Sequence, residues 1–206
     1  IIAKGNSLSG ISKMIFFWAI KVGMQYTEAG GPKGLYRIKL SIADRLVFSK
    51  WRDVLGGSVK VMVSGSSSLQ PRLAKIFSAA GIPVIEGYGL TETSPVLCAN
   101  DFGEKNMTYG SVGAPLAQVE VIIAEDGEIL AKGPNIMLGY YKDPKLTAEV
   151  IDKDGWFHTG DLGKFNGKGH LLITGRKKEL FKTSFGKYIA PTPLENKLQE
   201  SVFIEN

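Results

Sequence analysis

The sequence has few of the residues on which several protein classes depend. Its 206 residues include one cysteine, Cys98, which excludes an internal disulfide and fits a reducing compartment such as the cytoplasm. No apolar run approaches the roughly 18 residues that cross a bilayer, and the longest, at 14–20, is flanked by lysines and predicts a helix face. There are two histidines, and neither belongs to a serine or cysteine pattern typical of nucleophilic catalysis, so we interpret His158 as structural.

The charge is also modest. A net charge of +5 with no evident cluster suits acidic ligands such as phosphates, but it gives no evidence of nucleic-acid binding. The hydrophobic fraction of 44% is enough for the core of one large or two small domains. The chain begins at Ile1 and stops at Asn206 in mid-pattern, so we interpret it as a piece of a longer protein.

The first third of the chain predicts two helices. Apolar positions at 11–26 indicate one helix, and 41–55 indicates an amphipathic second helix that ends at Gly56-Gly57. A glycine-rich linker is expected between them, at 27–37. The apolar residues of the second helix fall roughly on one side: Ile42, Leu46, Trp51, Val54 and Leu55.

The centre predicts a βαβ unit. An apolar strand at 59–63 is followed by a helix at 71–80 and a second strand at 82–86, and the crossover makes the strands parallel. The loops "SGSSS" (64–68) and "GYGLTE" (87–92) then leave the same edge of the sheet, where ligands bind in open α/β folds. Their small residues and hydroxyls favour close approach of a phosphate to backbone amides.

The remainder predicts antiparallel structure. Alternating segments surround two hairpin signals, Asp126-Gly127 and Asn166-Gly167, which suggest a small barrel-like sheet. Around 174–196 the chain becomes basic and then helical. The predicted fold is therefore α/β, with a parallel sheet and βαβ unit (1–94), a β-rich barrel-like subdomain (95–177), and a hinge with the start of a truncated C-terminal domain (178–206).

Three residues could carry chemistry, and each has an ordinary alternative. Tyr88 could stack on a flat ring or pack in the core. Glu92, between two threonines, could hold Mg²⁺ or simply be a solvated turn residue. Asp161, after Gly160, could accept from ribose hydroxyls or be a common turn aspartate.

Two further segments draw attention. The cations between 173 and 191 follow glycines at two points, which indicates a mobile loop, although a solvated face is the usual alternative. "GGPKG" (30–34) resembles the end of a phosphate-binding loop but lacks its spacing and a preceding strand, so we interpret it as a linker.

The order of the motifs is more specific than any one of them. "YGLTE" (88–92), "GEILAKG" (127–133), "WFHTGD" (156–161) and "GRKKELFK" (175–182) occur in the order and approximate spacing of the AMP-forming acyl-CoA synthetases, the adenylate-forming enzymes. The region from "IFFWAIKVG" to "VKVMVSGSSSL" further resembles the long-chain fatty-acid–CoA ligase branch. The resemblance covers nearly the whole chain.

This resemblance implies roles for individual residues. Tyr88 would stack on adenine opposite Ser66, Ser67 and Ser68, with Gly87 and Gly89 allowing close approach. Thr91 would contact the α-phosphate, and Glu92 would hold Mg²⁺. Asp161 and Arg176 would bind the ribose hydroxyls, Lys178 would be the hinge of a rotating C-terminal domain, and Lys182 would serve the half-reaction with CoA.

The implied activity uses ATP, Mg²⁺ and CoA to convert a fatty acid into its CoA thioester through an acyl-adenylate. The family's upstream phosphate loop and its C-terminal adenylation lysine are both missing, so we expect the chain alone to be inactive and to bind adenine nucleotide weakly at best. Two alternatives stay open: a non-catalytic nucleotide-binding or scaffold protein, and an adenylation domain that loads a carrier protein. A phosphate-loop NTPase is disfavoured by the spacing at 30–34. Peripheral membrane contact would suit a greasy substrate, and no oligomeric state is predicted.

Overall fold

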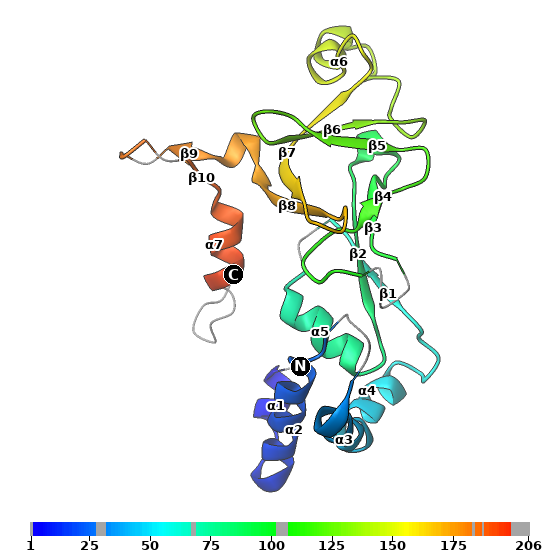
Figure 1. Cartoon of the computed structure of the whole chain (residues 1–206), viewed down its shortest axis with the longest axis vertical. Coiled ribbons are helices and arrows are strands. Elements are labelled where there is room, and N and C mark those ends of the chain that lie inside the picture. Colours follow the sequence, from blue (N-terminus) through cyan, green and yellow to red (C-terminus); the bar gives the residue numbers. More distant parts are fainter. Residues whose placement is uncertain are drawn as a thin grey trace. The chain divides into compact units, whose positions relative to one another are not determined.

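The structure, a computed structural model, describes residues 2–27, 32–66, 69–101, 107–182, 184–186 and 188–198. The chain divides into two compact units (Figure 1). The first consists of Ile1–Glu86 and Asp101–Gly110, and the second of Gly87–Asn100 and Ser111–Asn206. The boundaries predicted near residues 94 and 177 stay predictions.

The first unit is mainly helical. It contains α1 (Ile2–Asn6), α2 (Gly10–Gly23), α3 (Gly34–Ala43), the π-helical segment η1 (Asp44–Phe48) and α4 (Ser49–Val54), the last three following one another without a break. Its core joins one side of α2 to one side of the long α3–α4 segment. The buried residues include Phe16, Ala19, Val22, Ala43, Val47 and Phe48. Trp51 packs against Phe16 and Phe48, with ring centroids 6.1 and 5.2 Å away.

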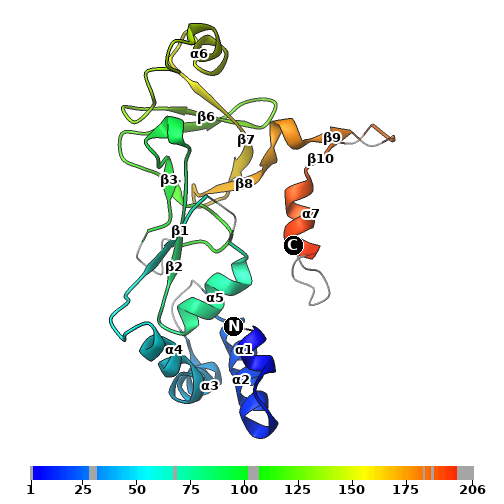
Figure 2. The same cartoon turned by 180° about the vertical axis from the view of Figure 1, so that it is seen from behind.

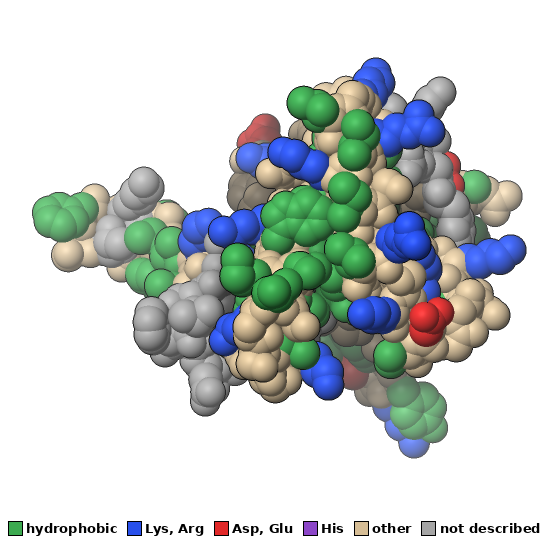
Figure 3. Space-filling model, turned by 90° about the horizontal axis from the view of Figure 1, so that it is seen from below, with side chains coloured by type: hydrophobic (Ala, Val, Ile, Leu, Met, Phe, Trp, Pro, Cys, Tyr) green, Lys and Arg blue, Asp and Glu red, His purple; other side chains and the backbone are tan. Residues whose placement is uncertain are grey.

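Two predictions for this region are wrong in part. The glycine-rich linker is shorter than expected, because α3 already begins at Gly34. The buried side of the second helix also differs from the predicted one: of its five apolar residues, all except Trp51 are exposed. Figure 3 shows hydrophobic side chains gathered on the surface of this helical region, with Lys and Arg among them. Ala43, Val47 and Phe48 face the core instead, in one cluster with Phe16, Ala19 and Val22 of α2.

The predicted βαβ unit is confirmed. Strand β1 (Met62–Ser64) lies parallel to β2 (Val84–Tyr88), and helix α5 (Pro71–Ala79) connects them. Ser64 is opposite Glu86. The first strand begins at Met62 instead of residue 59, because only Met62–Ser64 pair with β2.

The end of β2 belongs to the second unit. Gly87 and Tyr88 pair antiparallel with β3 (Cys98–Ala99), which pairs in turn with β4 (Ala114–Pro115). An antiparallel sheet of β5 (Glu120–Ile123), β6 (Glu128–Lys132), β7 (Phe157–Phe165) and β8 (Leu171–Arg176) follows (Figure 2). The mixed α/β fold with an antiparallel part is therefore confirmed. The core of this unit contains Leu97, Cys98, Ile129, Ala131 and Leu171.

Both predicted hairpins form. Gly127 has a φ of 87° in the β5–β6 turn, as a tight turn requires. In the β7–β8 turn, Gly169 adopts the positive φ of 76°. The Asn166 side chain shapes that turn, because its Oδ1 accepts from the backbone N–H groups of Lys168 and His170.

Helix α6 (Pro144–Val150) is capped by the Asp143 carboxylate, which accepts from Leu146 N–H. The C-terminal segment contains η3 (Lys177–Glu179), β9 (Phe181–Lys182), β10 (Tyr188–Ile189) and α7 (Pro191–Leu198). Among the residues that the structure describes, no helix has the length and apolarity needed to cross a membrane.

Candidate functional site

Three of the predicted site residues meet in the second unit. Tyr88 at the end of β2 donates its hydroxyl to Asp161 Oδ2 at 2.7 Å, and Arg176 Nε donates to Asp161 Oδ1 at 3.1 Å. Asp161 and Arg176 are directly opposite each other on β7 and β8. The pairing of three strands therefore brings together residues that lie far apart in the sequence.

The surroundings fix the backbone at Asp161 and the phenol that donates to its carboxylate. Its own backbone N–H donates to Thr159 Oγ1, which in turn donates to Ile129 O at 2.8 Å. Burial raises the pKa of Tyr88 well above its ordinary value, so its hydroxyl stays protonated and donates. A carboxylate held in this way keeps lone pairs with which it can accept hydrogen bonds from a ligand hydroxyl.

A short 3₁₀ turn, η2 (Thr91–Thr93), carries the predicted phosphate and metal residues. Thr91 is exposed, and Glu92 Oε1 accepts from the Tyr140 hydroxyl at 2.8 Å. The bond to Glu92 raises the pKa of Tyr140. Tyr140 was missed by sequence reasoning, because nothing in "LGYYKD" distinguishes it from the adjacent Tyr141.

Other contacts hold this turn rigid. The Thr93 side chain is fully buried, and its Oγ1 accepts from Leu90 N–H at 2.9 Å. Asn135 Nδ2 donates to the carbonyls of Thr93 and Val96 at 2.9 and 3.0 Å. The turn thus presents Thr91 and Glu92 on a fixed backbone, as a preorganised site requires.

The two glycines around Tyr88 have different surroundings. A Cβ added to Gly89 would lie 1.7 Å from Pro95 O, which no side chain can tolerate. A Cβ on Gly87 would meet Cys98 O at 3.5 Å, an ordinary contact. Gly89 is therefore required by the folding of the turn itself, whereas the fold does not require glycine at position 87.

A buried carboxylate lies beside the Asp161 strand. Glu128 on β6 accepts from Gly160 N–H and from Lys177 Nζ, both at 2.9 Å, and lies 3.3 Å from His158 Nδ1. Lys177 also pairs with Asp126 at 2.6 Å. Burial opposes ionisation of Glu128, but the bonds from Lys177, His158 and Gly160 outweigh it, so its pKa lies below the ordinary value.

This carboxylate links two predicted site residues. Gly160 immediately precedes Asp161, and Lys177 immediately follows Arg176. His158 also contacts this carboxylate, and its structural role stays a prediction. The role of Glu128 could not be recognised from the sequence, because its partners are 30 or more residues away.

In the first unit, Glu86 holds the loop after β1. Its Oε1 accepts from Leu69 N–H at 3.3 Å, and Gly110 N–H also donates to this side chain. Burial raises the pKa of Glu86 to about 6. In the same loop, Ser66 is exposed with a φ of 66°, while Ser67 and Ser68 lie outside the described residues.

The two predicted lysines are exposed near the end of the described chain. Lys178 is in η3, directly after the anchored Lys177. Lys182 on β9 is opposite Tyr188 on β10, with its Nζ 5.5 Å from the ring centroid. Among the described residues, neither lysine forms a hydrogen bond or an ion pair with the Tyr88–Asp161–Arg176 group.

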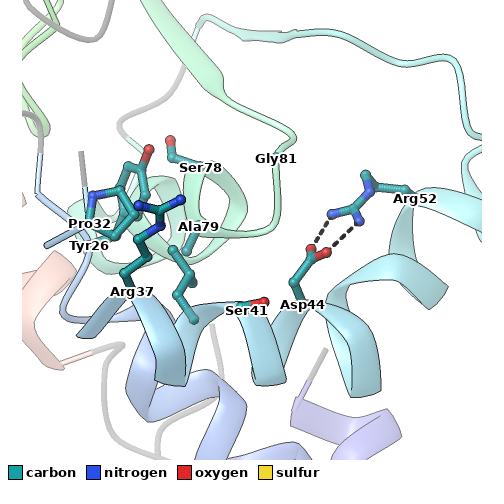
Figure 4. A pocket seen from close by; sticks show the side chains of 10 residues that line it. Tyr26, Pro32, Arg37, Ser41, Asp44, Arg52, Ser78, Ala79 and Gly81 are labelled. Atoms are coloured by element: carbon teal, nitrogen blue, oxygen red, sulfur yellow. Dashed lines mark hydrogen bonds and ion pairs between the residues drawn. The ribbon is translucent and has the colours of Figure 1, made fainter. Parts of the chain in front are cut away.

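A cavity of about 390 Å³ lies in the first unit and contains none of the predicted site residues (Figure 4). In its lining, Arg52 donates to both carboxylate oxygens of Asp44, at 2.6 and 3.0 Å, and to Ala80 O at 2.6 Å. These bonds tie α4 to the end of α5. We therefore assign the Asp44–Arg52 pair a structural role.

Comparison with known proteins adds to this geometry. Long-chain-fatty-acid–CoA ligase FadD15 of Mycobacterium bovis is 40% identical over 200 residues, which are 96% of this chain and 33% of the relative. Long-chain-fatty-acid–CoA ligase 1 of Homo sapiens is 40% identical over 191 residues, 87% of this chain and 27% of the relative. The chain thus spans about a third of the length of these curated relatives.

A solved structure shows the same fold. The o-succinylbenzoate CoA synthetase of Bacillus subtilis, in complex with its acyl-adenylate intermediate OSB-AMP, matches with a TM-score of 0.63 and 27% identity, over 74% of this chain and 34% of that one. The sequence profile of the family "AMP-binding enzyme" matches residues 26–141. Since this match covers more than half of the chain, the chain belongs to the family of AMP-binding enzymes.

Proposed function

We propose that this chain is part of a long-chain fatty-acid–CoA ligase. In the first step the fatty carboxylate attacks the α-phosphate of ATP, forming an acyl-adenylate and releasing pyrophosphate. In the second step the CoA thiol displaces AMP. The observation that carries the proposal is the Tyr88–Asp161–Arg176 group, in a chain 40% identical to long-chain ligases.

The nucleotide would bind at this group. The Tyr88 ring would stack on adenine, with Ser66, Ser67 and Ser68 on the other side. The Asp161 carboxylate would accept from the ribose hydroxyls beside Arg176. Two observations support this: burial keeps the Tyr88 phenol protonated, and the bonds from Tyr88 and Arg176 hold the Asp161 carboxylate in place.

The phosphates would lie at the η2 turn, with Thr91 at the α-phosphate and Glu92 at Mg²⁺. Glu92 uses one carboxylate oxygen to accept from Tyr140, which leaves the other for a cation. The described residues contain no group of three or more metal-ligating side chains. One free carboxylate oxygen from Glu92 fits an Mg²⁺ ion that is held chiefly by phosphate oxygens and water. Mg²⁺ would offset phosphate charge, while Thr91 and Glu92 orient the phosphates.

Lys178 would be the hinge, and Lys182 would serve the second step with CoA. The two ion pairs of Lys177 support a pivot at Lys178, because they anchor the residue that directly precedes it. We also propose a cytoplasmic location. The scarcity of cysteine supports it, since the one cysteine, Cys98, is a free thiol, as is usual in a reducing compartment.

ATP–pyrophosphate exchange by the complete parent protein tests the proposal, with fatty acids from short to long. The informative variants are Glu92→Gln, which keeps an acceptor for Tyr140 but removes the charge, and Tyr140→Phe, which keeps the charge. Glu149→Gln is the matched control, because that carboxylate is exposed on α6. We expect exchange that depends on a long fatty acid, falls at least a hundredfold in Glu92→Gln, and is unchanged in Glu149→Gln.

The outcomes separate the alternatives. A folded protein that binds ATP but exchanges with no acid is a non-catalytic nucleotide binder. Exchange that transfers the acyl group to a carrier protein and not to CoA identifies a carrier-loading adenylation domain. Equal loss in Glu92→Gln and Tyr140→Phe would contradict a direct role of the Glu92 charge.

A further inference from the structure

The Glu92 carboxylate has a single recorded partner. Its Oε1 accepts from the Tyr140 hydroxyl at 2.8 Å, and among the described residues the structure records no other hydrogen bond and no ion pair to this carboxylate. A glutamate side chain has several rotatable bonds and loses much freedom when it is ordered. Glu92 is only half-buried, so packing restrains it less than it would a buried side chain. The Tyr140 hydroxyl therefore sets the direction of the carboxylate.

The segment that carries Tyr140 also holds the backbone of the η2 turn. Met137 N–H donates to Glu92 O at 2.8 Å, and Asn135 Nδ2 donates to Thr93 O at 2.9 Å. The segment thus contacts both the main chain and the side chain of the turn. Because these bonds fix the spacing between the two stretches of chain, the phenol reaches the carboxylate in one geometry.

Helix α6 holds Tyr140 in turn. Thr147 Oγ1 accepts from Tyr140 N–H at 2.9 Å, and the same hydroxyl donates to Asp143 O at 2.8 Å. Gly139 lies directly against this threonine, since an added Cβ would be 2.8 Å from Thr147 Cγ2. A side chain of α6 therefore fixes the backbone that carries the phenol.

We propose that Tyr140 and Thr147 are positioning residues for the metal carboxylate. Thr147 fixes Tyr140, and the Tyr140 hydroxyl orients Glu92, whose free oxygen would bind Mg²⁺. The inference rests on the proposed role of Glu92. Hydrogen bonds that orient a metal ligand typically change metal affinity or activity ten- to a hundredfold. The described residues offer Mg²⁺ no group of three ligating side chains, so the direction of this one carboxylate matters more.

ATP binding with and without Mg²⁺ tests the proposal. The dissociation constant of the complete parent protein for ATP is measured by calorimetry in excess Mg²⁺ and again in EDTA. We expect Tyr140→Phe and Thr147→Val to raise the constant in Mg²⁺ roughly tenfold and to leave the constant in EDTA unchanged. The Mg²⁺ concentration that gives half-maximal ATP–pyrophosphate exchange should rise by a similar factor.

The chain offers matched controls. Tyr141→Phe removes a hydroxyl from the neighbouring residue, which is 88% exposed and has no recorded hydrogen bond to the described residues. Thr147→Ser keeps the hydroxyl that Thr147→Val removes. Both controls should bind ATP like the wild type. Tyr140→Phe added to Glu92→Ala should cause no further loss, because the hydroxyl acts through that carboxylate.

The other outcomes are distinct. If Glu92→Gln weakens binding in Mg²⁺ and Tyr140→Phe does not, the inference is wrong and the proposed function stands. Equal weakening by Tyr140→Phe in Mg²⁺ and in EDTA would show that Tyr140 only supports the fold, which also overturns the inference. If Glu92→Gln itself has no Mg²⁺-dependent effect, the proposed metal role of Glu92 is wrong, and the inference is wrong with it.

Discussion

Glu86 allows a quantitative prediction about stability. Glu86 is 7% exposed, and burial raises its pKa from the ordinary value of 4.5 to about 6. Because the folded pKa is the higher one, the folded state keeps a proton that the unfolded state releases between these values. The contribution of Glu86 to the free energy of unfolding is therefore complete below about pH 4 and is lost as the pH rises through about 6.

The magnitude follows from the shift. A difference of about 1.5 units corresponds to about 2 kcal/mol at neutral pH, at about 1.36 kcal/mol per unit. Glu86→Gln removes the titration and keeps an acceptor for Leu69 N–H. We expect the variant to be more stable than the wild type at pH 7 by about 1–2 kcal/mol, the loss of charge-assisted bonds offsetting part of the gain. The advantage should vanish below about pH 4.

Urea unfolding between pH 4 and 7.5, followed by the fluorescence of Trp18 and Trp51 in the first unit, measures this difference. Glu149→Gln is the control, since its exposed carboxylate should give no pH-dependent change. A free-energy difference between wild type and Glu86→Gln that is independent of pH would refute the reasoning, as would a variant less stable than wild type at pH 7. A stabilising result would mean that Glu86 is kept at the expense of stability, as is common beside functional loops.

Two further changes test the second unit. Gly89→Ala should destabilise this unit by more than about 3 kcal/mol, because the new Cβ would overlap Pro95 O. Gly87→Ala is the control and should fold normally. Thermal unfolding compares the two variants. Lys177→Met should lower the free energy of unfolding at pH 7 by about 1–2 kcal/mol, a value reduced for the half-exposed lysine. Loss of the Lys177 ammonium raises the pKa of Glu128, so the difference in free energy of unfolding from the wild type should shrink below about pH 4. A difference that is constant with pH would contradict the ion-pair explanation.

Local patterns predicted much of the fold. The strand–helix–strand order required parallel strands, and Asp126-Gly127 marked a hairpin that the structure contains. The periodicity of 41–55 predicted a helix but not its buried side. Which side packs depends on the fit to α2, and both sides of this helix are apolar enough to be candidates.

The sequence by itself determined which chemical groups are available and in what order: a tyrosine after a strand, a carboxylate between threonines, an aspartate in a turn. Tertiary structure decided which groups meet. Tyr88 and Asp161 bond across 73 residues, Glu92 and Tyr140 across 48, and Glu128 and Lys177 across 49. Sequence spacing carries no information about such partners, because strand pairing and core packing, set by the whole chain, bring them within hydrogen-bond distance.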